Sequence, residues 1–246
     1  PAPLPLILAL LLLFQGCAPV VKKDDQTQQM PLLRAQIATL LENGDLSQAA
    51  SLLESIAQSS ASPQREDLLL EAGEIWGLAG DWSRTEAILQ SLTSQMPNQE
   101  LAMRRRLLLA ELAIHHRDLD RALDLLQPPP GPDSPLMLRQ RYHKNMAEVF
   151  RLSGNLLESA RELVELDGLI EEPQTREANQ LLLVETLSIM TDTALALLKP
   201  DPPGILGGWM DLVRILKHQR DDPANFGPQY QAWREAYPGH PAQPEM

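Results

Sequence analysis

The five histidines of this chain are the residues that could most readily take part in acid–base or metal chemistry. The nearest approach to a metal site is His115-His116 followed by Asp118. Adjacent histidines project to different sides of a helix, and no cysteine or further histidine nearby offers a third ligand. Histidines at a helix end also interact favourably with its negative dipole terminus, which explains their place without a metal. We therefore expect no metal and no cofactor.

The remaining histidines, His143, His218 and His240, each stand alone. The sequence has no glycine-rich phosphate loop, no nucleophile elbow and no His-Glu-x-x-His pattern. We predict that the chain is not an enzyme and has neither catalytic residues nor a small-molecule substrate. An enzyme such as a lytic transglycosylase, with a catalytic glutamate in a cleft, stays as an alternative, but no glutamate is distinguished by its neighbours.

Cys17 is the only cysteine, and it follows an almost unbroken apolar run from Leu4 to Phe14. That run has the length of the apolar part of a signal peptide and is too short to span a bilayer. Gly16-Cys17 resembles the end of a lipobox, the site at which bacterial lipoproteins are cleaved and lipidated. Gln15 and Phe14 depart from the commonest residues there. An ordinary thiol is the alternative, but we expect lipidation of Cys17.

Residues 1–16 are accordingly expected to be a lipoprotein signal peptide. Ala18 resembles the residue that directs a lipoprotein to the outer membrane. Several acyl chains would hold the protein stably on that membrane, facing the periplasm. Residues 17–30 are polar and lack apolar periodicity, so we expect a flexible tether.

The formal net charge is −12, with 33 acidic against 21 basic residues. Nucleic acids and anionic lipid surfaces are bound through clustered Lys and Arg, so no nucleic-acid partner is expected. The one basic run is Arg104-Arg105-Arg106. Three successive residues of a helix point in different directions, which favours a solvated or stem-packed face.

The elements that would position these residues follow one sequence pattern that is repeated five times. Its marker is a turn-like pair followed by a small residue, at Gly44-Asp45…Ala49, Gly80-Asp81…Thr85, Arg117-Asp118…Ala122, Gly154-Asn155…Ser159 and Thr191-Asp192…Ala196. The first members lie at 44, 80, 117, 154 and 191, a period of 36 or 37 residues. Self-similarity at such a period indicates a solenoid of stacked units, which favours binding over catalysis.

Each unit is expected to be a hairpin of a helix before the turn, here called helix A, and a helix after it, helix B. Four positions before the turn stand Leu40, Trp76, Ala113, Phe150 and Leu187. Small residues dominate seven positions before the turn and five after it, where they let helices A and B approach closely. Asp or Asn in the turn suits the N-cap of helix B.

These columns resemble the tetratricopeptide repeat, and the second unit shows the likeness best, with Trp76 and Gly80. Thr85 and Ser159 replace the usual alanine, Arg117 and Thr191 replace the turn glycine, and the period exceeds the usual value of about 34 residues. The predicted fold is all-α, a tetratricopeptide-like helical-hairpin solenoid of five hairpins over residues 31–199. Its structural repeat residues include Ala49, Trp76, Gly80, Ala122, Phe150 and Gly154.

The period is lost after residue 199, and we expect a closing helical hairpin and linker over residues 200–246. Trp209 begins one helical pattern, and Phe226, Tyr230, Trp233 and Tyr237 mark another at spacings of 4, 3 and 4. Tyr and Trp combine an apolar ring with a polar group, which suits the partly solvated end of a solenoid.

The ending is the most specific part of the chain: Gly204-Ile205-Leu206-Gly207-Gly208-Trp209, Gln231-Ala232-Trp233 and Tyr237-Pro238-Gly239-His240-Pro241. With the lipobox and the repeats, it resembles the N-terminal part of the LppC/LpoA family of outer-membrane lipoproteins. That resemblance implies a non-enzymatic regulator that activates a bifunctional class A penicillin-binding protein, a peptidoglycan synthase. It also implies an α/β domain beyond residue 246, so that this part supplies anchor and spacer.

A generic tetratricopeptide lipoprotein that scaffolds an envelope assembly, such as outer-membrane protein insertion, is the alternative. It would share the lipobox and the repeats without requiring the 204–241 ending. Repeat columns are explained by packing alone, so the sequence singles out no partner-binding residue.

Overall fold

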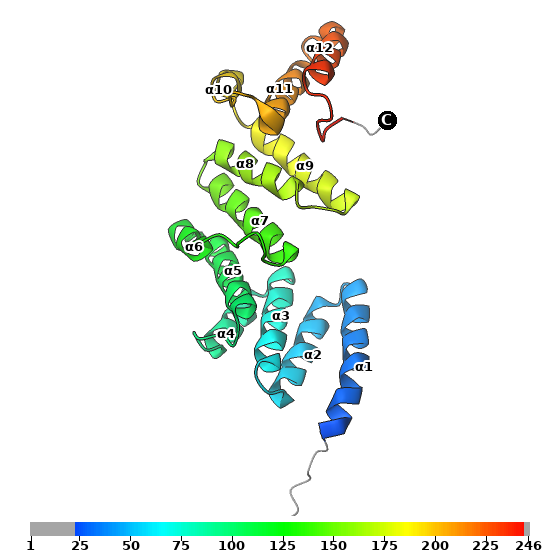
Figure 1. Cartoon of the computed structure of the whole chain (residues 1–246), viewed down its shortest axis with the longest axis vertical. Helices are drawn as coiled ribbons and strands as arrows, with labels where there is room; N and C mark the ends of the chain where they lie inside the picture. The colour runs from blue at the N-terminus through cyan, green and yellow to red at the C-terminus, as the bar shows by residue number, and fades with distance from the viewer. Residues whose placement is uncertain (1–22, 244–246) are drawn as a thin grey trace, which may run out of the picture.

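The computed structural model describes the backbone of residues 23–243 and the side chains from residue 30 onward. The described part is all-α, as expected, with twelve helices stacked along one long axis from α1 at one end to α12 at the other (Figure 1). The helices are α1 (Lys23–Glu42), α2 (Leu46–Ser59), α3 (Gln64–Leu78), α4 (Trp82–Ser91), α5 (Gln99–His115), α6 (Leu119–Leu126), α7 (Leu136–Leu152), α8 (Leu156–Asp167), α9 (Pro173–Ser188), α10 (Asp192–Leu197), α11 (Gly204–His218) and α12 (Pro223–Ala236).

Consecutive helices form the expected hairpins. Units 1 to 5 are α1–α2, α3–α4, α5–α6, α7–α8 and α9–α10, and α11–α12 is the closing hairpin. Each of α3, α5 and α7, which are A helices, also packs against the A helix of the neighbouring unit. Side chains on neighbouring A helices can therefore meet although they lie a whole repeat apart in sequence. Among the described helices, none has the length and apolarity needed to cross a membrane.

The repeated turn joins helix A to helix B through a short connection, shown here for α3 and α4. Gly80 has a φ of +80°, and its N–H donates to the carbonyl of Gly77 at 3.0 Å. The Asp81 N–H donates to the carbonyl of Trp76 at 2.9 Å, which completes a Schellman motif at the end of α3. The Asp81 carboxylate then accepts the N–H of Arg84 at 3.1 Å and caps α4. The Gly-Asp pair thus ends one helix and starts the next.

Three other turns have the same geometry, with a positive φ at Gly44, Arg117 and Gly154. Arg117 is the only non-glycine residue with a positive φ in the described part of the chain. It adopts this conformation because the fold requires a left-handed residue at that place, against the preference of a residue with a Cβ.

At the fifth turn, the expected register is wrong by one residue. Thr191 is the N-cap of α10, and its hydroxyl accepts the N–H of Ala194 at 3.2 Å. Met190 therefore holds the place of the turn glycine, and Leu195 holds the place expected for Ala196. Leu195 is fully buried and Ala196 is exposed. The reason is that the Thr191 hydroxyl caps α10, so the place of the turn glycine falls on Met190, which does not have the positive φ of the other turns. The short α10 packs against α11.

The small-residue column after the turn lies in the core of each of the first four hairpins. Ala49 and Ala122 are fully buried, and Thr85 and Ser159 are buried as well. The Thr85 hydroxyl donates to the carbonyl of Gly73 at 3.0 Å, and Ser159 donates to the carbonyl of Ala147 at 2.8 Å. The two departures from alanine therefore add a hydrogen bond between helix B and helix A of their own hairpin.

The predicted tether is wrong over its last eight residues, because α1 begins at Lys23 and includes residues 23–30. The polar residues there are mostly acceptable helix formers and extend the helix that packs against α2. The predicted signal peptide and Cys17 lie outside the described residues.

Candidate functional site

The side chains of His115, His116 and Asp118, considered above as a metal site, do not point toward one common position. His115 stacks on Trp82 with ring centroids 4.8 Å apart, and His116 meets the edge of His115. Asp118 caps α6 by accepting the N–H of Arg121 at 3.3 Å. Within residues 30–243, no group of three or more His, Cys, Asp or Glu side chains is placed to hold a metal ion.

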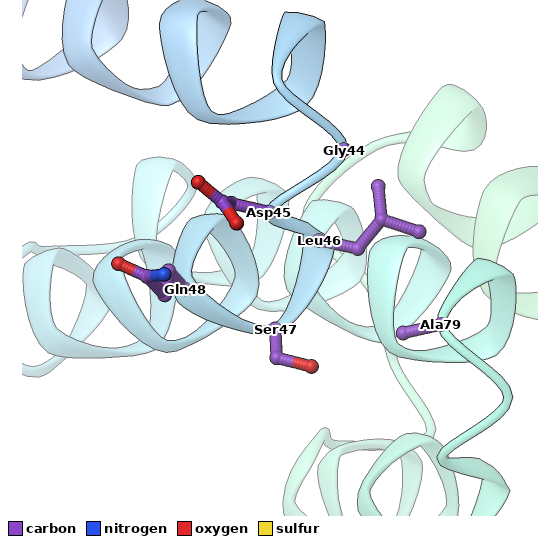
Figure 2. A pocket seen from close by; sticks show the side chains of 6 residues that line it. All are labelled: Gly44, Asp45, Leu46, Ser47, Gln48 and Ala79. Carbon is purple, nitrogen blue, oxygen red and sulfur yellow. The ribbon is translucent and has the colours of Figure 1, made fainter.

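A surface hollow of about 300 Å³ lies beside the first turn (Figure 2). Gly44, Asp45, Leu46, Ser47 and Gln48 line one side of it, and Ala79 at the end of α3 lines the other. Figure 2 shows the Asp45 and Gln48 side chains on one side of the turn and Leu46 directed toward Ala79. The single carboxylate, that of the N-cap residue Asp45, gives this hollow no set of converging groups for a ligand or a reaction.

The densest arrangement of charge lies along the A helices. We call it the ion-pair seam and define it by Asp67 and Glu74 of α3, Arg104 and Glu111 of α5, and Arg141 of α7. Arg104 donates from Nη2 to Glu74 Oε2 at 2.7 Å and from Nε to Glu74 Oε1 at 3.1 Å, and it also pairs with Asp67. This bidentate contact joins unit 3 to unit 2.

Arg141 extends the seam over three units. Its Nε and Nη2 donate to the two carboxylate oxygens of Glu111 at 2.6 Å each, and its Nη1 donates to Glu74 Oε1 at 2.6 Å. Asn145 adds a hydrogen bond to Glu111 at 3.1 Å. A single side chain on α7 thus reaches across α5 to α3.

The two arginines of the seam are largely buried, and this affects both their pKa values and the strength of their ion pairs. The Arg104 and Arg141 side chains are only 12 % and 18 % exposed. Burial by itself would lower the pKa of each guanidinium, but the hydrogen bonds and charges of the paired carboxylates outweigh it, so both pKa values are raised. Both groups stay charged, and a partly buried network of this geometry fixes how neighbouring units are oriented.

Sequence reasoning missed this seam, although a signal was present. Asp67, Arg104 and Arg141 are each 37 residues apart, and so are Glu74 and Glu111. Charges repeated at the period of a solenoid occupy equivalent places on successive A helices. The Arg104-Arg105-Arg106 run was predicted as a solvated or stem-packed face, but Arg104 lies in the seam and Arg106 donates to the carbonyl of Gln127 at 2.7 Å.

The remaining predicted repeat residues lie where packing requires them. Trp76 is buried, its indole N–H donates to Glu54, and Arg84 lies over its ring at 4.3 Å. Phe150 is half-buried against the core of units 3 and 4, and Gly154 takes the left-handed place in the fourth turn.

The closing hairpin is built around two buried tryptophans. Trp209 of α11 and Trp233 of α12 are each 3 % exposed. The Trp233 indole N–H donates to the carbonyl of Gly208 at 2.8 Å. His240 meets the edges of both indoles, with ring centroids 5.1 Å from each. A Cβ on Gly208 would lie 2.5 Å from His240 Cδ2, so only glycine leaves room for the imidazole.

This hairpin and the five units together match one family over residues 22–245, described as "LppC putative lipoprotein". The chain belongs to this family. A relative from Aliivibrio fischeri, named Penicillin-binding protein activator LpoA, is 34 % identical over 102 residues, which are 41 % of this chain and 17 % of the relative. A Pasteurella multocida protein of the same name is 25 % identical over 105 residues, 42 % of this chain and 18 % of the relative.

Solved structures of LpoA share the fold of this LppC-family chain. The LpoA N-terminal domain from Haemophilus influenzae has a TM-score of 0.66 at 17 % identity and matches 78 % of this chain and 86 % of that one. The E. coli LpoA amino-terminal domain has a TM-score of 0.67 at 21 % identity, over 78 % and 85 %. Full-length LpoA from H. influenzae has a TM-score of 0.69 at 17 % identity, over 78 % and 35 %. The chain spans less than a fifth of the length of the two curated relatives.

Proposed function

We propose that this chain is the N-terminal, tetratricopeptide-like part of an outer-membrane lipoprotein that activates a bifunctional class A penicillin-binding protein. The observation that carries the proposal is the family match, which runs from residue 22 through the closing hairpin to residue 245. Both relatives named above are penicillin-binding protein activators, and the LpoA amino-terminal domains have the same fold.

We propose a separate role for each segment, in the order of the chain. Residues 1–16 direct export, the lipid on Cys17 anchors the protein at the periplasmic face of the outer membrane, and the units that follow act as a spacer. The start of α1 at Lys23 shortens the proposed tether to residues 17–22. A spacer must hold its shape, and the ion-pair seam supports this role because it ties units 2, 3 and 4 to one another.

The proposed activity is non-enzymatic. An activator of this kind changes the rate of its partner enzyme by contact, so it needs a stable surface and no catalytic group. The scaffold alternative would require a partner of another class, an envelope assembly machine.

The test is a synthesis assay with purified class A penicillin-binding proteins of the same bacterium. The protein encoded by the whole reading frame should increase glycan polymerisation or peptide cross-linking by at least one of them. The chain of residues 23–246, assayed in parallel, shows whether the spacer portion stimulates by itself. No stimulation of any class A enzyme by the whole protein, with co-purification of an envelope assembly complex, would support the scaffold alternative instead.

A further inference from the structure

The segment after α12 folds back onto the closing hairpin and is fastened there by His240. The His240 side chain is 6 % exposed, between Trp209 and Trp233 and above Gly208. A buried histidine can act as a conformational switch, because its charge state changes near neutral pH. The contacts around its two ring nitrogens determine what such a device would respond to.

The hydrogen bonds of the imidazole assign a single neutral tautomer. Nε2 lies 2.9 Å from the carbonyl oxygen of Ile205, which can only accept, so Nε2 carries the proton. Nδ1 lies 3.2 Å from the backbone N–H of Ala242, which can only donate, so Nδ1 carries none. A second proton on Nδ1 would place two donors face to face and remove the bond that holds Ala242.

The tail is tied down by few other contacts. The Gln243 side-chain amide donates to the carbonyls of Tyr237 at 2.7 Å and Arg234 at 3.0 Å, and the Gln243 backbone N–H donates to the carbonyl of His240 at 2.8 Å. All of these contacts lie within the last turn of α12 and the tail itself. Tyr237, at the start of the tail, also bonds to Asp211 of α11, and beyond Tyr237 the His240 imidazole is the main polar link between the tail and α11.

We propose that residues 237–243 form a pH-sensitive clasp, closed on α11 while His240 is neutral and released when Nδ1 takes up a proton. The clasp would control the path of residues 238–243 relative to α11. This inference depends on the geometry of the closing hairpin and holds whether or not the proposed activator function is correct.

The neighbouring titratable groups do not remove this sensitivity. Burial lowers the pKa of His240, although the Ile205 carbonyl and the charge of Asp167 at the end of α8 oppose that shift. On α11, Asp211 accepts from the Tyr237 hydroxyl at 2.6 Å and from Lys199 at 2.9 Å, so its charge is already paired. Burial and the bond to Asp211 raise the pKa of Tyr237, which stays neutral over the range of interest.

The sign of the effect follows from this lowered pKa. The closed form binds a proton less readily than a free histidine, whose pKa is about 6.5. As the pH falls below that value, the released form takes up protons that the closed form does not, and release becomes more favourable. Each unit of difference between the two pKa values changes the ratio of released to closed tail about tenfold.

Hydrogen–deuterium exchange on the chain tests the clasp. After correction for intrinsic rates, the backbone amides of Ala242 and Gln243 should be protected at about pH 7.5 and lose that protection at about pH 5. His240→Gln keeps a donor for the Ile205 carbonyl but cannot be charged, so its tail should stay protected at both values. His116→Gln, which removes an exposed histidine in the turn after α5, should behave like the unmodified chain.

A second measurement covers the case in which the glutamine of His240→Gln does not pack against α11 as the histidine does. In an NMR titration of the unmodified chain, the His240 imidazole should have a pKa below that of a free histidine, and the amide signals of Ala242 and Gln243 should change over the same pH range. A normal or raised pKa of His240 would overturn the proposal. So would a tail that stays equally protected at both pH values.

Discussion

Replacing Gly80 with alanine should destabilise the protein through the backbone alone. The φ of Gly80 is +80°, and a Cβ added there would meet no atom within 4 Å. Placing a residue with a Cβ in the left-handed region costs about 1–2 kcal/mol. The lower entropy of the unfolded chain returns roughly 0.4–1 kcal/mol. The expected net loss in the free energy of unfolding is therefore about 1 kcal/mol, measured by urea denaturation.

Gly168→Ala is the matched control. Gly168 is also exposed, but its φ is −67°, and its nearest new contact would be an ordinary 3.6 Å from the carbonyl of Glu165. Alanine is allowed there, so the substitution should be neutral or stabilise by up to about 1 kcal/mol. Arg117→Gly should stabilise the protein, because it relieves a left-handed residue that has a Cβ. If Gly80→Ala and Gly168→Ala shift the urea midpoint alike, backbone conformation does not explain the turn glycines.

Three further outcomes are expected. Glu74→Ala removes a carboxylate that pairs with both Arg104 and Arg141, so it should lower the free energy of unfolding by about 2 kcal/mol or more in a urea titration. In the same titration Glu148→Ala, which breaks an exposed ion pair within one helix, should cost less than about 1 kcal/mol. Thr85→Val keeps the volume but removes the hydrogen bond from the hydroxyl to the Gly73 carbonyl, so calorimetry should show a loss of about 0.5–1.5 kcal/mol, and an unchanged melting temperature would contradict the role given to that hydroxyl. Cys17→Ala should move the protein from the outer-membrane fraction to the soluble fraction, and its retention on membranes would refute the lipobox assignment.

Sequence reasoning succeeded where the physical cause is local. Gly44, Gly80 and Gly154 mark their turns because a left-handed residue excludes most side chains. Asp81 and Asp118 cap helix B in their turns by accepting the N–H three residues later, whereas Asp45 and Asn155 make no such side-chain bond. The buried small column was recognisable because it lets two consecutive helices approach. The same logic failed at the fifth turn, where Thr191 was aligned by its likeness to the other turns but serves one place later.

Tertiary structure decided the contacts between units and the closure of the end. Arg141 and Glu74 lie 67 residues apart and meet only because α3, α5 and α7 pack side by side. Nothing near either residue in the chain indicates that partner. His240 was predicted as an isolated histidine between two prolines, and its neutral tautomer follows only from the carbonyl and the amide that the folded tail brings to its two nitrogens.

The sequence by itself therefore determined the repeat, the first four of its turns, the all-α class and the family. The tertiary structure decided which charges pair and which histidine is buried. The physical reason is one of range: a turn or a cap depends on a few adjacent residues, whereas an ion pair or a buried imidazole depends on side chains that only the packed solenoid brings within hydrogen-bond distance.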